Sequence, residues 1–163
     1  MPGFGPKMAR LAGRLGDGLI TLLQPLDHYK NVLFPAVEEG AKPEGRSPHE
    51  ICKVIELDVT YDEDYDRALE SVRFMAQTLL PEVFKNPIPD PRVLEAMGKK
   101  VSDKDLEEAF VISTSSEEHI RKIEEVFKVG FDHVHISSSA FDEEGLIRMY
   151  KKEVLPYFTQ GKR

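Results

Sequence analysis

The sequence has almost no cysteine and no tryptophan: Cys52 is the one cysteine among 163 residues. A single cysteine cannot form an intramolecular disulfide, and this count also excludes a cysteine-rich metal site. Such usage is typical of a reducing compartment, so we expect a cytoplasmic protein. The sequence also lacks an apolar run long enough to cross a membrane and any N-terminal signal of the secretory type.

Basic residues are also in short supply. The chain has 22 Lys and Arg against 29 Asp and Glu, which gives a formal net charge of -7. A nucleic acid or an anionic membrane needs a net basic surface, so neither is expected as the main partner. At 163 residues with 40% hydrophobic composition, the chain is long enough for one domain with a core, and we expect a single domain over residues 1–163.

Apolar spacing divides the chain into alternating helices and strands. Helical periodicity predicts a helix over residues 6–15, and a short apolar run predicts a strand at 19–23. Alternation in KVIELDVTY and the segment FDHVHIS predict two more strands. Further helices are expected over residues 27–40 with a break at Pro35, 62–80, 91–98, 103–109 and 115–129, with an irregular proline-rich insertion at 81–91 and a last helix ending near Pro156.

Strands joined through helices indicate an α/β fold with a parallel sheet. About three strands with four main helices leave two open sheet edges, which proteins usually cover or pair. We therefore expect the sheet to need a partner, either further sequence or a second chain.

Four stretches carry a family resemblance: GFGPKMARLAGRLGDGLI, FPAVEEGAKPEGRSP, FVISTSSEEHIRKIEEVFKVGFDHVHIS and YKKEVLPYF. Their order is similar to that in the luciferase-like flavin and deazaflavin oxidoreductases, nearest to the branch of coenzyme F420-dependent glucose-6-phosphate dehydrogenases. The resemblance runs from Gly3 to Phe158 and implies the C-terminal half of a TIM-type (β/α)8 barrel. It also implies that the strand before Gly3 and the whole N-terminal half are absent.

The first loop is a candidate phosphate site. Gly3, Phe4, Gly5, Pro6 and Lys7 precede or open a helix, where backbone amides and the helix dipole favour an anion. The other interpretation is that glycine and proline only make a tight helix start. The resemblance implies that this loop contacts the phosphate tail of coenzyme F420, with flavin mononucleotide as the alternative cofactor.

The resemblance also concerns the substrate. Lys85 matches one of three cationic positions that sugar-phosphate members use, whereas the other two fall near Gln24-Pro25 and on Ala109, which are not basic. Two lost cations remove roughly 1.5–3 kcal/mol of charge-assisted hydrogen bonding each. Glucose 6-phosphate is therefore not the expected substrate, and Lys85 is either a substrate-binding residue or an ordinary surface lysine.

Other polar residues have two interpretations each. Glu56 and Asp58 share one side of a strand and are either catalytic candidates inside a barrel or a solvated face. His133 and His135 share a side of the last strand, but no third ligand accompanies them, so no metal site is predicted. The serines that follow, including Ser137, either donate to a ligand or cap the last helix.

The resemblance implies an oxidoreductase that transfers hydride between the cofactor and a small organic substrate. In the family the acid and base residues lie mostly in the N-terminal half, so no catalytic residue is assigned and activity of this chain alone is not expected. Two partners are considered: a separately encoded N-terminal half-barrel, or a second copy of the chain. The second case describes a non-catalytic or vestigial half-barrel that self-associates through its open sheet edges.

Overall fold

The computed structural model describes residues 1–160 and divides the chain into two compact units. The first unit consists of residues 1–57 and 121–137, and the second consists of residues 58–120 and 138 onward. Strand β2 (Cys52–Tyr61) and helix α7 (Ser116–Val129) each have residues in both units. The single domain expected over residues 1–163 stays a prediction. No helix within residues 1–160 is long and apolar enough to cross a bilayer.

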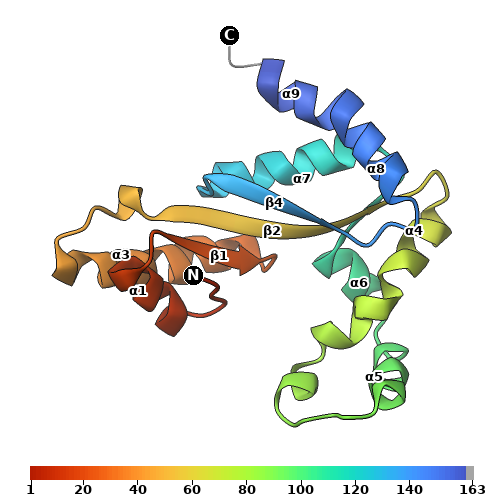
Figure 1. The fold of residues 1–163 in the computed structure, drawn as a ribbon, viewed down its shortest axis with the longest axis horizontal. Helices are drawn as coiled ribbons and strands as arrows, with labels where there is room; N and C mark the ends of the chain where they lie inside the picture. The colour runs from red at the N-terminus through yellow and green to blue at the C-terminus, as the bar shows by residue number, and fades with distance from the viewer. Residues whose placement is uncertain (161–163) are drawn as a thin grey trace. The chain divides into compact units, whose positions relative to one another are not determined.

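The first unit alternates helices and parallel strands (Figure 1). Strand β1 pairs with β2 in parallel register from Gly18↔Cys52 to Leu22↔Glu56. Strand β4 also pairs with β2, and the Asp132 amide donates to the Lys53 carbonyl where that pairing begins. The elements in chain order are α1 (Pro6–Leu15), β1 (Gly18–Leu22), α2 (Leu26–His28), a π-helical turn (Tyr29–Leu33), α3 (Phe34–Ala41), the first part of β2, most of α7 and β4 (His133–Ser138).

A short extended segment precedes Gly3 and pairs with β1. Pro2 and Ile20 form a parallel bridge, the Gly3 amide donates to the Ile20 carbonyl at 2.9 Å, and the Ile20 amide donates to the Met1 carbonyl at 2.9 Å. This contact is an isolated bridge, and within residues 1–160 no named strand precedes Gly3. The exposed edge of β1 offers free backbone groups, and even three residues can satisfy some of them.

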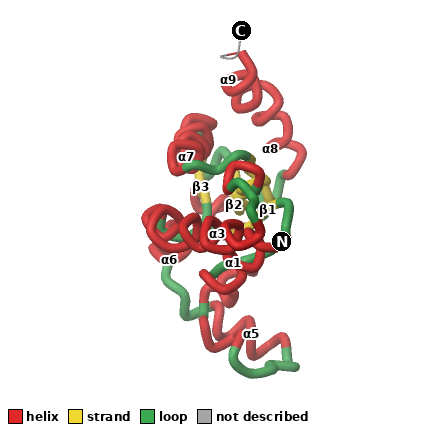
Figure 2. The backbone as a smooth tube through the Cα atoms, turned by 90° about the vertical axis from the view of Figure 1, so that its left-hand side faces the viewer, coloured by secondary structure: helices red, strands yellow, loops and turns green. Residues whose placement is uncertain are grey.

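Helices α1 and α3 lie side by side over the sheet (Figures 1 and 2). Two glycines permit this close approach. A Cβ atom added to Gly13 would lie 2.0 Å from the Val37 carbonyl oxygen, and one added to Gly40 would lie 1.9 Å from the Arg10 carbonyl oxygen. Any side chain at either position would push the helices apart, so Gly13 of the AGRLGDG stretch has a packing role.

Two prolines lie within continuous helical segments, and in both cases a π-helical turn comes directly before. The Phe34 amide donates to the Tyr29 carbonyl, five residues back, before Pro35. The wider turn accommodates a residue without an N–H and relieves the clash of its ring with the preceding turn. The Leu155 amide bonds Tyr150 in the same way before Pro156, and the helix continues as α9 (Leu155–Gln160). The predicted end near Pro156 is therefore wrong.

The second unit contains the end of β2 and a set of shorter elements. Strand β3 (Val111–Ser113) pairs in parallel with β2, with Val59↔Val111 as the first matched pair. The predicted helix over 62–80 is α4 (Tyr65–Val72) followed by a 3-10 segment (Arg73–Leu79). The predicted helices α5 (Pro91–Gly98) and α6 (Asp103–Ala109) are confirmed, and the last helix begins as α8 (Glu143–Met149). A hydrophobic core cluster of the second unit consists of Leu69, Val72, Ala76, Val101, Leu106 and Phe110.

Candidate functional site

The Gly3–Lys7 loop connects the short N-terminal segment to α1, includes the first two residues of that helix and leaves its start open. Gly5 is the N-cap residue with extended backbone (φ -143°, ψ 168°), and it has no side chain to accept from the first amides. The first turn of α1 contains no acidic residue. The amide groups and positive end of the helix dipole therefore have no anionic group from the first turn beside them.

The two glycines of this loop have different surroundings. A Cβ atom on Gly3 would lie 2.9 Å from both Leu19 Cδ1 and Met8 Cβ, so the fold itself requires glycine there. A Cβ atom on Gly5 would meet nothing within 4 Å. Its backbone angles are also accessible to any residue. The internal packing of the chain therefore does not require glycine at Gly5.

Only one of the three basic residues of α1 carries an unpaired charge in the described structure. Arg10 forms an ion pair with Glu39 at 2.7 Å, and Arg14 forms one with Glu44 at 2.9 Å. Lys7 is exposed and forms no ion pair with a residue in the range 1–160. Of these three residues, Lys7 is therefore the one whose charge remains available, and it is also the last residue of the Gly3–Lys7 segment.

The end of β1 supports the same loop. The Gln24 side chain is within 3.5 Å of the Phe4 carbonyl oxygen, and the Gln24 amide donates to the Tyr29 hydroxyl, which in turn donates to the Leu22 carbonyl. Burial raises the pKa of Tyr29 to about 12, so this phenol stays neutral and remains a donor. Phe4 itself is 54% exposed, and its ring is available to a bound molecule.

The polar side of β2 meets the last strand. His135 Nδ1 lies 3.4 Å from a Glu56 carboxylate oxygen, so the structure brings together two residues that are 79 positions apart. His133 is exposed, and Asp58 alternates along β2 onto the side of Glu56. Among residues 1–160 no three His, Cys, Asp or Glu side chains form a group that could hold a metal ion.

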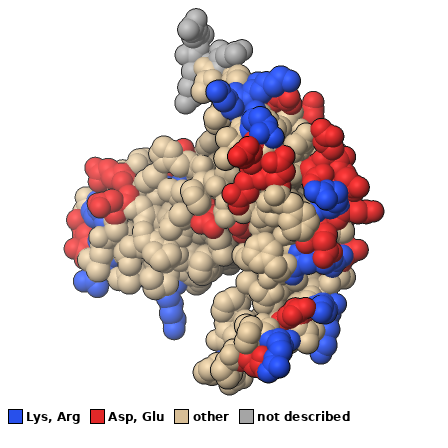
Figure 3. All heavy atoms as spheres, turned by 45° about the vertical axis from the view of Figure 1, so that its right-hand side comes forward, with Lys and Arg blue, Asp and Glu red and all other residues tan. Residues whose placement is uncertain are grey.

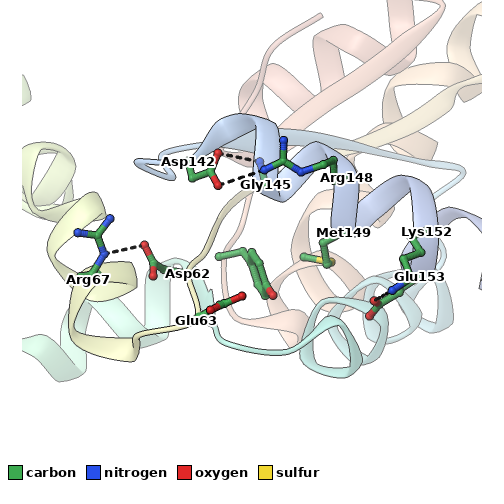
Figure 4. A pocket seen from close by; sticks show the side chains of 10 residues that line it. Asp62, Glu63, Arg67, Asp142, Gly145, Arg148, Met149, Lys152 and Glu153 are labelled. Carbon is green, nitrogen blue, oxygen red and sulfur yellow. Dashed lines mark hydrogen bonds and ion pairs between the residues drawn. The ribbon is translucent and has the colours of Figure 1, made fainter.

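A cavity of about 520 Å³ lies in the second unit, where β2 ends (Figure 4). Its walls come from the residues after β2, from the start of α4 and from one side of α8 and the turn that follows. Asp142 caps α8 by accepting from the Gly145 amide at 2.8 Å, and a Cβ on Gly145 would lie 2.3 Å from that carboxylate. The lining residues are Tyr61, Asp62, Glu63, Arg67, Asp142, Gly145, Arg148, Met149, Lys152 and Glu153.

Each cation that lines this cavity faces a carboxylate. Arg67 bonds Asp62 at 3.0 Å, and Arg148 contacts Asp142 at 3.4 Å. The Asp64 amide, and next the Arg67 side chain, hold the pKa of Asp62 below its usual range. Figure 3 likewise shows basic side chains beside acidic ones rather than gathered into one basic area. The cavity can offer hydrogen bonds to a polar molecule, but its three basic residues face four acidic ones, so it has no net positive charge for a phosphate.

Sequence reasoning missed this cavity, although one signal was present. Charged residues follow directly on a strand at Asp62 and Glu63, and side chains at the carboxyl ends of parallel strands often form sites. The partners from residues 142–153 come from a distant segment, and no local pattern links them to Asp62.

Lys85 follows a 3-10 turn (Pro81–Phe84) in the insertion of the second unit. It is exposed and forms no ion pair with any residue of the described range, and other residues line the cavity described above. Ala109 is the last residue of α6 in the same unit, whereas Gln24 belongs to the first unit. The role of Lys85 in substrate binding stays a prediction.

A buried polar pair lies elsewhere in the second unit. His119 of α7 is 1% exposed, and its Nδ1 lies 3.0 Å from the Tyr150 hydroxyl. Burial lowers the pKa of His119 to about 4, although the Thr60 carbonyl offsets part of the shift, and burial also raises the pKa of Tyr150. Tyr150 is 8% exposed, so both side chains of this pair lie away from solvent.

Parallel strands connected through helices, with polar loops at the carboxyl ends of the strands, are typical of α/β folds such as the TIM barrel. Residues 1–133 match the family described as luciferase-like monooxygenase, and the chain belongs to this family. It is the C-terminal half of such a barrel.

Several relatives depend on coenzyme F420. The chain is 32% identical over 153 residues to the F420-dependent glucose-6-phosphate dehydrogenase of Microbacterium testaceum, covering 93% of this chain and 46% of the relative. A solved F420-dependent secondary alcohol dehydrogenase in complex with an F420-acetone adduct matches with a TM-score of 0.84 at 34% identity, over 93% of this chain and 46% of that one. The F420-dependent tetrahydromethanopterin reductase of Methanopyrus kandleri matches with a TM-score of 0.74 at 29% identity, over 97% and 50%. The chain thus spans about half the length of these relatives.

Proposed function

We propose that the chain forms the cofactor-holding C-terminal half of an F420-dependent oxidoreductase, with the Gly3–Lys7 loop as its phosphate site. The observation that carries this proposal is the open space at Gly5 beside an uncapped helix start. An anion bound there would accept from backbone amides of α1, and Lys7 would supply the positive charge that is left unpaired among the described basic residues of that helix. Gly3 and the Gln24 contact to Phe4 hold the loop in place.

The F420-dependent relatives favour the deazaflavin over flavin mononucleotide. When bound, coenzyme F420 would supply the group that accepts or gives a hydride. The residues of this chain bind the phosphate, orient the loop and offer the Phe4 ring, but none is assigned a proton-transfer role. Hydride transfer with a small organic substrate therefore depends on residues outside this chain's described elements.

The substrate is proposed to lack a phosphate. Ala109 and Gln24 are neutral at two positions where the resemblance implies cations, and the cations of the cavity in the second unit are already paired. Lys85 would then be a single exposed charge. An uncharged alcohol or ketone requires no such cluster, and the solved relative with an F420-acetone adduct is consistent with that class.

The test is a titration of the protein into coenzyme F420, followed by the fluorescence anisotropy of the cofactor, with flavin mononucleotide as a comparison. We expect saturable binding by the wild type and a loss of at least about tenfold in Lys7→Ala, because a charge-assisted bond to phosphate is removed. Lys42→Ala is the matched control, since Lys42 is also an exposed lysine of the first unit. Equal binding by Lys7→Ala and the wild type, or no binding at all, would contradict the proposal.

A further inference from the structure

The two sides of the sheet in the first unit are buried to very different extents. On the side that carries α1 and α3, Leu19 and Thr21 are each 1% exposed and Ile55 and Leu57 are 0% exposed. On the opposite side, Leu22 is 39% exposed, although it alternates with those residues along β1. Parallel sheets are normally covered on both sides, so the second side is incomplete as it stands.

We call this second side the open face, and it consists of Ile20, Leu22, Val54, Glu56, His133 and His135. The register of β1 against β2 places Ile20 beside Val54 and Leu22 beside Glu56. The Glu56 contact to His135 extends the face onto β4. Apolar side chains thus occupy β1 and the start of β2, while a polar pair occupies the border with β4.

The edge of the sheet beside the open face is also available. Within the described residues β4 pairs with β2, and no strand is seen on its other edge. The Asp132 amide donates to the Lys53 carbonyl, so the pairing with β2 uses one edge of β4. The backbone groups on the other edge of β4 are available to a parallel strand. A partner that covers the open face and contributes such a strand would bury the exposed side chains and also pair the free backbone groups of β4.

We propose that the open face and the free edge of β4 bind the N-terminal half of a luciferase-like barrel. The matches to two F420-dependent relatives cover 93–97% of this chain but only 46–50% of the relatives. The relatives therefore contain a further part of about the same length, which is large enough to cover the open face. An N-terminal half would bring parallel strands with it, one of them beside β4. It must also offer polar groups to Glu56 and His135, because burying them unmatched would be costly. This inference rests on the proposed function, since it supplies the residues that hydride transfer lacks.

The test uses the N-terminal half of the Microbacterium testaceum relative, without the segment that matches this chain, co-expressed with the present chain. We expect a complex of one copy of each, measured by native mass spectrometry, with slower hydrogen exchange at β1 and β4. Leu22→Glu places a charge on the open face and should weaken the complex by at least about tenfold. Leu15→Glu is the matched control, because Leu15 is 67% exposed on α1 and lies outside the open face.

Three results would overturn the inference. One is the absence of a complex between the two wild-type halves, and another is equal weakening by Leu22→Glu and Leu15→Glu. The third is a stable dimer of the present chain that Leu22→Glu disrupts, which would identify a second copy as the occupant. Circular dichroism of both variants checks that they fold. Mass and exchange are measured without coenzyme F420, so a failure of cofactor binding leaves this result readable.

Discussion

The sheet of the first unit has a covered side and an open face, and side chains of the same strands are buried on one and exposed on the other. On the covered side, glycines bring helix backbones into contact and leave no room for a methyl group. On the open face, Leu22 and the His135 side chain remain 39% and 58% exposed. The contrast teaches that one side of this sheet is already closely packed within the described residues, whereas the other side still exposes large side chains.

The largest effect is expected from a change that breaks the covered side. In Gly40→Ala the new Cβ would lie 1.9 Å from the Arg10 carbonyl oxygen, so α1 and α3 must separate. We expect a loss of about 4 kcal/mol in the free energy of unfolding, measured by urea denaturation, or failure to fold. Gly5→Ala is the control, with an expected loss below about 1 kcal/mol. Similar losses in both variants would show that the contrast between the two glycines is not real.

A second pair of variants compares the two sides of β1 directly. Leu19→Ala removes a side chain that is 1% exposed and should cost about 3 kcal/mol in the free energy of unfolding. Leu22→Ala removes one that is 39% exposed and should cost less than about 1 kcal/mol. Urea denaturation of both proteins gives the two values. A cost at Leu22 as large as that at Leu19 would mean that the open face is covered in solution by the chain itself or by a second copy.

Local patterns in the sequence predict much of the covered side. The spacing of apolar residues places α1 at residues 6–15 as observed, because its contacts repeat every turn. Gly130 follows α7 directly with a positive φ of 118°, a backbone conformation that favours glycine after a helix. The predictions of a helix break at Pro35 and a helix end near Pro156 are wrong, because a π-helical turn precedes each proline and the helix continues. Such a turn depends on the surrounding packing rather than on the proline itself.

The candidate site was predictable only where it is local. The Gly3–Lys7 loop is a contiguous motif, so the sequence shows it, but only the structure separates the crowded Gly3 from the open Gly5. The pairing of Glu56 with His135 and the cavity between residues 61–67 and 142–153 join segments about 80 positions apart. Such contacts follow from strand order and helix packing, which a single sequence does not encode in any local pattern.

The contrast between enclosed and open side chains can be sharpened in the second unit by pH. Burial holds the pKa of His119 at about 4 in the folded protein, below the ordinary value of 6.5 expected on unfolding. The unfolded chain therefore binds more protons in this window, so this contribution to stability is complete above pH 6.5 and declines as the pH falls toward 4.

Between pH 6.5 and pH 5 the loss from His119 should be about 1.5 kcal/mol, which is smaller than the losses expected for Gly40→Ala and Leu19→Ala. The measurement is urea denaturation across this range for the wild type and for His119→Gln, because carboxylates contribute to both proteins and cancel in the difference. The wild type should lose stability more steeply than the variant as the pH falls. Parallel pH profiles would show that His119 protonates in the folded state as readily as in the unfolded chain, and hence that the pair with Tyr150 is open to water.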